Sequence, residues 1–215
     1  MNAPSERSVF QLKAVISGIS PMIWRRFLLA GETTVAQLHY ILQIAFGWTD
    51  YYLHRFVIHA KPYGIRRIGS EWFSDDANTV TLLDLGLRVR ERFLYEYNFF
   101  DHWQVQLRVE KIIEPESEQS YPICIDGKRN GPIEDCGGAW AFQELRQEFS
   151  ELSVACRMAE IFVKEEIAEC RAELRELSYW LLLDKLELSK LNYRLQQNPL
   201  SEDSVFREEI IFIDS

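Results

Sequence analysis

The sequence lacks several features that would place it in a common functional class. It has no apolar run long enough to span a bilayer, and its first eight residues contain no apolar core like that of a signal peptide. Its four cysteines show no CxxC spacing, so the pattern predicts reduced thiols in a cytoplasmic protein. A GxSxG elbow, a P-loop and a dinucleotide-binding glycine fingerprint are also absent from the sequence.

A basic excess is missing as well. The chain carries 24 Lys and Arg against 33 Asp and Glu, a net charge of −9. Residues 151–215 hold 8 basic and 14 acidic residues, a net of −6, which leaves −3 for residues 1–150. Neither part can neutralise many phosphates, so nucleic-acid binding by the whole chain is not expected. The pairs Arg25–Arg26 and Arg66–Arg67 are interpreted as solvated surface.

The first third of the chain predicts two strands and a capped helix. Residues 9–19 and 23–29 alternate in polarity and read as a hairpin around Ser20-Pro21. Thr34 and Gln37 form a capping-box pattern before a helical apolar face, and Gly47 stands where a C-terminal cap is expected.

The middle of the chain predicts further strands without a βαβ rhythm. The expected elements are strands over 54–60, 92–98 and 102–113, a short helix over 81–87 and a strand beginning near residue 121. This order favours an α+β fold, with a small mixed sheet and a capped helix over residues 8–149. A long helical segment within 150–215 follows that domain.

The C-terminal segment has a heptad pattern. Helical periodicity runs from Trp140 to about Gln197, and apolar residues recur at two positions in each seven. The residues expected to mediate association are Leu174, Leu177, Trp180, Leu181, Leu188, Leu191 and Leu195. Asp184 interrupts the seam, and the wide stripe near Trp180 favours a bundle over a plain two-stranded zipper. Two interpretations stay open: packing within the chain, and association with a second copy or another protein.

A set of polar residues outside this segment forms a candidate polar cleft. Its members are His39, Asp50, His54, Asn98, Asp101, Glu134, Asp135 and Cys136. His54 and His59 would point to opposite faces of one strand, which disfavours a shared metal. A contact of His54 with Asp50 or His39 across a turn stays open, and so do plain polar roles for all three.

Two loops supply the rest of the candidate cleft. Asp101 next to His102 could orient a proton-transfer group, but a turn acid between strands with paired aromatic residues is the favoured interpretation. The run Glu134-Asp-Cys-Gly-Gly138 places acids, a thiol and two glycines together. No histidine follows Cys136 to activate it, and a zinc site would find three ligands at most. We therefore predict no catalytic residue, no metal and no cofactor.

Five ordered motifs within residues 8–149 resemble the plasmid pRiA4b ORF-3-like family. They are Ile19-Ser-Pro-Met-Ile-Trp-Arg-Arg26, Leu38-His39 with Ala45-Phe-Gly-Trp48, Leu53-His-Arg-Phe56, Tyr95-Glu-Tyr97 with Asp101-His-Trp103, and Glu134-Asp-Cys-Gly-Gly138. The resemblance implies a compact bacterial α+β domain, often found near mobile elements, with no established activity.

Departures from the family pattern bear on any site the family has. Asn98 and Phe100 stand where the pattern has Asp and Gly, and Tyr52 stands where it has His. Gly131 replaces the first cysteine of the pattern Cys-Pro-Pro-Glu-Asp-Cys. A polar cleft in this chain would thus have lost a carboxylate, an imidazole and a thiol.

These observations favour a non-catalytic interaction protein that associates through its C-terminal helical segment. The alternative is an enzyme or a ligand- or metal-binding protein with a cleft near His54, Asp101 and Glu134–Cys136. A DNA-associated accessory factor is the weakest hypothesis, because the chain is acidic.

Overall fold

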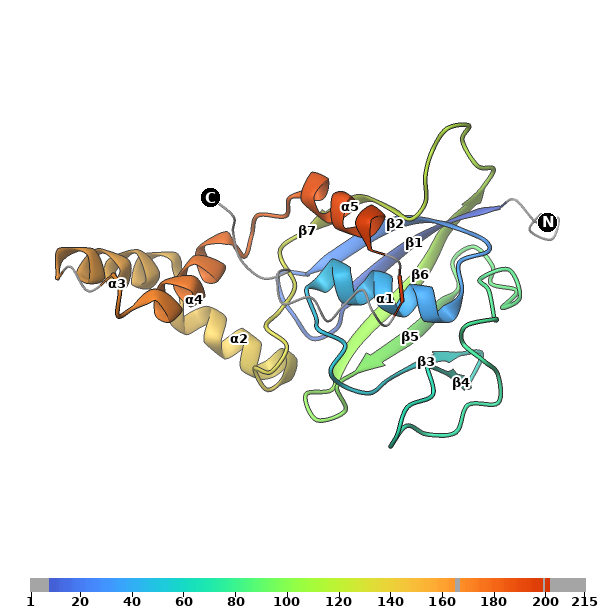
Figure 1. The fold of residues 1–215 in the computed structure, drawn as a ribbon, viewed down its shortest axis with the longest axis horizontal. Coiled ribbons are helices and arrows are strands. Elements are labelled where there is room, and N and C mark those ends of the chain that lie inside the picture. The colour runs from blue at the N-terminus through green and yellow to red at the C-terminus, as the bar shows by residue number, and fades with distance from the viewer. Residues whose placement is uncertain (1–7, 165–166, 199, 202–215) are drawn as a thin grey trace.

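The computed structural model describes residues 8–164, 167–198 and 200–201, and it combines an antiparallel sheet with five helices (Figure 1). The strands run in the order β4-β3-β5-β6-β1-β2-β7. Their bounds are β1 Val9–Ile16, β2 Trp24–Ala30, β3 His54–Ile58, β4 Lys61–Tyr63, β5 Arg92–Tyr97, β6 Trp103–Ile113 and β7 Ile123–Lys128. The helices are α1 Val35–Phe46, α2 Gly138–Glu148, α3 Glu151–Val163, α4 Arg171–Leu182 and α5 Leu188–Gln197.

The α+β class is confirmed, and the sheet is more regular than expected. Every pairing between the described strands is antiparallel, whereas a mixed sheet was predicted. The β1–β2 hairpin forms with Val9 opposite Ala30. The alternating apolar residues of β1 and β6 are buried, which gives the sheet one core-facing surface.

Helix α1 covers that surface and is buried along almost its whole length (Figure 1). The capping box is present, since the Thr34 side chain accepts from the amide of Gln37 and the Gln37 side chain accepts from the amide of Thr34. Gly47 ends the helix in the left-handed conformation, with φ 75°. Residues 81–87, expected as a short helix, form turns instead.

The C-terminal segment is helical, as predicted, and it is divided into the separate helices α3, α4 and α5. Helix α4 ends at Leu182 because Asn130 satisfies its last carbonyls. The Asn130 side-chain amide donates to Leu182 O at 2.9 Å, and its backbone amide donates to Leu183 O at 2.7 Å. Asp184, the residue that interrupts the heptads, then pairs with Arg129 and Arg146.

Much of the heptad seam packs inside the chain. Leu177, Trp180, Leu191 and Leu195 are buried, and the other three predicted association residues are partly buried. Helix α5 lies beside α1 and β7, whereas α3 and α4 form a hairpin that projects away from the sheet (Figure 1). Within the described ranges, none of the helices combines the length and apolar character that crossing a bilayer requires.

Candidate functional site

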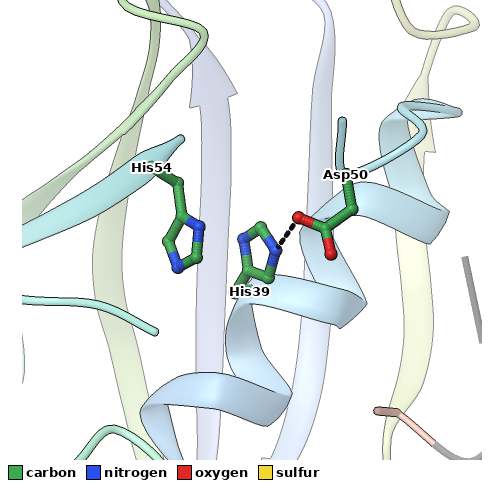
Figure 2. Close-up of side chains that lie close together, drawn as sticks. All are labelled: His39, Asp50 and His54. Carbon is green, nitrogen blue, oxygen red and sulfur yellow. Dashed lines mark hydrogen bonds and ion pairs between the residues drawn. The ribbon is translucent and has the colours of Figure 1, made fainter. Parts of the chain in front are cut away.

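Three of the predicted cleft residues meet beneath the sheet-facing side of α1 (Figure 2). His39 comes from α1, Asp50 from the turn after it, and His54 from the first position of β3. All three side chains are buried. The close contact between these three residues, which the sequence left open, is therefore present in the structure.

His39 bonds through both ring nitrogens. Its Nε2 lies 2.8 Å from Asp50 Oδ1, and its Nδ1 lies 2.8 Å from the hydroxyl of Tyr95. Gln43 donates to the same hydroxyl at 2.8 Å and accepts from the amide of Asp50 at 2.9 Å. The bonds close a ring that ties α1, the turn at residue 50 and β5 together.

The hydrogen-bond roles follow from this ring. The carboxylate of Asp50 can only accept, so Nε2–H of His39 donates to it. Nδ1 of the neutral ring then accepts from the Tyr95 hydroxyl, whose oxygen accepts from Gln43. This arrangement satisfies a neutral imidazole. It agrees with the pKa of His39, which burial lowers despite the hydrogen bond to Asp50.

Asp50 is the charged member of the cluster, and Arg67 compensates it. Two guanidinium nitrogens of Arg67 lie 2.8 and 2.5 Å from the two carboxylate oxygens, in a bidentate pair. Burial alone would raise the pKa of Asp50, but hydrogen bonds from His39 and Arg67 outweigh it and lower that pKa. Asp50 is therefore ionised in the folded chain, with φ at 59°.

His54 is buried beside His39 with fewer partners. The backbone amide of Ile65 donates to its Nε2 at 3.3 Å, and its Nδ1 has no partner among the described residues. Burial lowers the pKa of His54 well below its ordinary value, and the neighbouring His39 and Arg67 act in the same direction. His54 is therefore a neutral ring in contact with His39.

This geometry does not suit a metal ion, although one ligand atom from each of His39, Asp50 and His54 lies within 4.8 Å of the others. A metal binds an imidazole nitrogen in the plane of the ring, and the two rings stack with planes only 13° apart. Two parallel, stacked planes share no point where an ion could sit. Both nitrogens of His39 also already carry hydrogen bonds. The cluster fits a structural polar network.

The second part of the predicted cleft is centred on Glu134. Its carboxylate accepts from the amide and hydroxyl of Thr49 and from the hydroxyl of Tyr97. Its backbone carbonyl accepts from the indole of Trp103 at 2.9 Å. The neighbouring Asp135 bonds the hydroxyl of Tyr52 and raises the pKa of that phenol to about 12. These contacts fasten the loop before α2 to the turn after α1.

The third part is the β5–β6 turn. Asn98, with φ at 51°, accepts from the amides of Phe100 and Asp101 through its side chain. Asp101 in turn accepts from the amide of Gly137 at 3.1 Å. The predicted cleft residues therefore lie in three hydrogen-bonded groups, and within the described part of the chain no hydrogen bond joins the side chains of His54, Asp101 and Glu134 to one another.

Cys136 lies in the same loop but is not an activated thiol. Burial raises its pKa to about 11, and the nearby Asp101 carboxylate acts in the same direction. Only a small fraction is thiolate at neutral pH, whereas nucleophilic cysteines have lowered pKa values.

Three members of the histidine network were not predicted. Neither Tyr95 nor Gln43 is among the predicted cleft residues, and Arg67 was interpreted as solvated surface. Gln43 follows His39 by one helical turn, so the sequence places both polar side chains on the same face of the capped helix, which was a signal for a polar network there. The partner of Asp50 carried no such signal, since Arg67 lies in an irregular loop.

Comparison with known proteins gives a consistent picture. Residues 8–154 match the model of a family described as plasmid pRiA4b ORF-3-like protein. An uncharacterized protein, y4hQ of Sinorhizobium fredii (strain NBRC 101917 / NGR234), is 29% identical over 150 residues, which are 67% of this chain and 74% of that protein. The crystal structure of MM3350 from Methanosarcina mazei Go1, a protein of unknown function, matches with 34% identity and a TM-score of 0.58. That match covers 67% of this chain and 82% of the other.

Proposed function

This chain belongs to the plasmid pRiA4b ORF-3-like family, and from that premise we propose that it is a non-catalytic interaction protein that associates with a second copy of itself. The proposed contact is the outer face of α3, in the part of the chain where the family match ends. A cytoplasmic location is part of the proposal, because no disulfide joins any of the four cysteines.

The observation that carries the proposal is an uncovered apolar stripe on α3. Val154 and Ile161 point inward and are buried. The opposite side repeats apolar residues at spacings of three and four, and all of them are exposed: Leu152, Ala155, Cys156, Ala159, Phe162 and Val163. Leu152 is 76% exposed and Val163 is 83% exposed. Such a stripe usually marks a face that packs against another helix.

We favour a second copy of this chain as the partner because the order of large and small side chains along the stripe is symmetrical about the middle of α3. Large side chains stand at both ends, and the small residues Ala155, Cys156 and Ala159 lie between them. A two-fold axis at the middle of the helix would place Leu152 of one copy beside Val163 of the other and small residues beside small ones. Two antiparallel helices could then approach closely, in an interface that uses the same patch twice.

A non-catalytic role is supported by the state of the polar residues. His39, Asp50 and Tyr95 satisfy one another in the core. Glu134 is occupied by Thr49 and Tyr97. Catalysis needs a base or nucleophile within reach of a substrate, and these groups are committed to holding loops in place.

The proposal is tested by light scattering of the full chain, whose monomer mass is 25.3 kDa. We expect the parent chain to have twice this mass and Val163→Asp to be a monomer. Tyr193→Asp, a change to an acid at an exposed aromatic residue of α5, should leave the dimer intact. A parent chain that stays monomeric at high concentration, or a Val163→Asp variant that stays dimeric, would overturn the proposal.

A second experiment uses the exposed thiol near the middle of the stripe. A short bismaleimide cross-linker should join two copies through Cys156, and Cys156→Ser should prevent the product. Cross-linking that persists at the same yield in Cys156→Ser would place the contact elsewhere.

A further inference from the structure

A cavity of about 370 Å³ lies at the junction between the family domain and the C-terminal helices. The domain supplies Arg25 from β2, the end of α1 and the loop before α2. The C-terminal helices supply Tyr179 from α4 and Arg194 from α5. This volume lies within the range of small-molecule sites, which are usually found between packed units.

Arg25 is a buried charge without a carboxylate partner. It is 1% exposed, although Arg25–Arg26 was expected to be solvated surface. Strand alternation turns Arg26 toward Glu110 and Asp126 on the other face and leaves Arg25 inside. Its guanidinium donates to the carbonyls of Ala45 at 3.1 Å, Trp24 at 2.9 Å and Lys128 at 3.2 Å. Within the described residues its Nη2 has no hydrogen-bond partner.

Arg194 lines the same cavity from the opposite side. It is half-buried, and within the described part of the chain its guanidinium forms no hydrogen bond or ion pair; its Nε is fully buried. Burial lowers the pKa of Arg194. Burial also lowers the pKa of Arg25, to about 10, and repulsion by Arg194 contributes to that shift. Both side chains are still protonated at neutral pH.

Two uncompensated guanidinium groups around one cavity are unusual in a chain with a net charge of −9. A buried charge without a counter-ion is costly, and buried charges are normally paired. Two acidic residues, Glu134 and Asp135, also line the cavity. The Glu134 carboxylate is held by Thr49 and Tyr97, and Asp135 bonds the hydroxyl of Tyr52, so neither pairs with an arginine. Within the described residues neither guanidinium group has a carboxylate partner, and an anion bound in the cavity would supply one.

We infer that this cavity binds a small organic oxyanion, a carboxylate or a phosphate ester, held between Arg25 and Arg194. Planar guanidinium groups match the paired oxygens of both anions. Phe46, Ile133 and Leu186 provide apolar walls, so a ligand with an apolar group beside its anionic end fits better than a bare ion. Arg194 lies outside the family match, so the C-terminal helices complete the site.

The inference is tested by calorimetry on the full chain with three probes: phenyl phosphate, benzoate and inorganic phosphate. Ionic strength is held constant with chloride. We expect saturable binding of phenyl phosphate or benzoate, and weaker binding of inorganic phosphate because it lacks an apolar group. Equal affinities for inorganic phosphate and phenyl phosphate would show that the apolar walls of the cavity do not contribute to binding.

Amino-acid substitutions test whether the two arginines bind the anion. Arg194→Gln should weaken binding at least tenfold, and it is preferred to a change at Arg25, which also holds three backbone carbonyls. Lys190→Gln removes an exposed cation from the same helix and should bind like the parent. The inference fails if none of the three probes binds saturably, or if Arg194→Gln binds as tightly as the parent. Val163→Asp should bind normally, which separates this test from that of association.

Discussion

The imidazole rings of His39 and His54 stack face to face, with centroids 3.6 Å apart and planes 13° apart (Figure 2). The two residues come from different elements, α1 and β3, so the contact joins the helix to the sheet. Stacking at this distance is favourable for neutral rings. It would be opposed by charge if both rings were protonated, which makes the pair sensitive to pH.

We expect the free energy of unfolding to fall as the pH drops below about 6.5. Burial lowers the pKa of both histidines in the folded chain; Arg67 and the neighbouring histidine add to this effect for His54, and Asp50 opposes it for His39. In the unfolded chain each histidine takes up a proton near its ordinary pKa of 6.5. The unfolded state therefore binds more protons below that pH. Each histidine then lowers the free energy of unfolding by up to about 1.4 kcal/mol for every pH unit of acidification. Above that pH this contribution is constant.

Urea unfolding at pH 7.5, 6.5 and 5.5 measures this dependence. His54→Phe keeps an aromatic ring in the stack and should remove about half of the slope between pH 6.5 and 5.5. His102→Asn is the control for removing a histidine from the surface, because residue 102 is exposed and Asn tolerates its φ of 53°. An identical slope in His54→Phe and the parent would contradict the assignment.

Asp50→Asn should destabilise the chain strongly without straining its backbone. Asn tolerates the left-handed conformation at φ 59°, so the effect comes from the side chain. The change leaves Arg67 without its bidentate partner and costs about 3–5 kcal/mol, as when one member of a buried pair is removed.

The matched control for Asp50→Asn is Asp75→Asn. Asp75 pairs with Lys61 at the surface, where both side chains are more than a third exposed. Loss of such a pair costs at most about 1 kcal/mol. Denaturant midpoints of the two variants should differ clearly, and similar midpoints would show that the Arg67–Asp50 pair contributes no more than a surface pair.

Gly138→Ala should lower the free energy of unfolding far more than the addition of a single methyl group suggests. Gly138 has φ at 83°, and a Cβ there would lie 2.2 Å from the carbonyl oxygen of Asp101. The backbone of the turn cannot yield as a flexible side chain would. Gly86→Ala is the matched control, because Gly86 also has a positive φ, at 60°, but nothing lies within 4 Å of its Cβ.

Thermal unfolding of the two glycine variants separates crowding from backbone strain. Gly86→Ala should lose about 1 kcal/mol, the cost of a left-handed alanine. Gly138→Ala should lose several times as much, since it must also separate the loop from the β5–β6 turn. Equal losses would show that close approach is not the reason for glycine at residue 138.

The strands and α1 were predictable because their signals are local. Burial on one face of β1 follows from alternation at Phe10, Leu12 and Ala14, and the start of α1 follows from Thr34 and Gln37. The nearness of Asp50 and His39 could be foreseen as possible, since a single helix end separates them. Each of these inferences uses residues fewer than about a dozen positions apart.

The remaining features depend on contacts between distant segments. Arg67 reaches Asp50 only because of the path of an irregular loop, and hydrophobic periodicity carries no information about such a path. The heptads did not predict the end of α4 at Leu182, because Asn130, the residue that bonds its last carbonyls, lies some fifty positions earlier. Arg25 looked like surface beside Arg26, although strand alternation separates their side chains.

Trp180 packs α4 against the aromatic residues of α2 and its C-terminal end, so replacing Trp180 should loosen the C-terminal helices. Its indole stacks on Phe149, with ring centroids 5.2 Å apart and planes 2° apart, and on Phe142 at 5.5 Å. Trp180→Ala leaves a cavity among these rings and should cost about 3–5 kcal/mol. Trp180→Phe keeps a ring there and removes an indole nitrogen that has no partner in the described residues, so it should cost less than about 1.5 kcal/mol.

Limited proteolysis within residues 167–198, followed by mass spectrometry, should therefore be fast in Trp180→Ala and near the parent rate in Trp180→Phe. If Trp180→Ala resists proteolysis as well as the parent, the C-terminal helices are held by α5 against α1 and β7, and not by this aromatic stack.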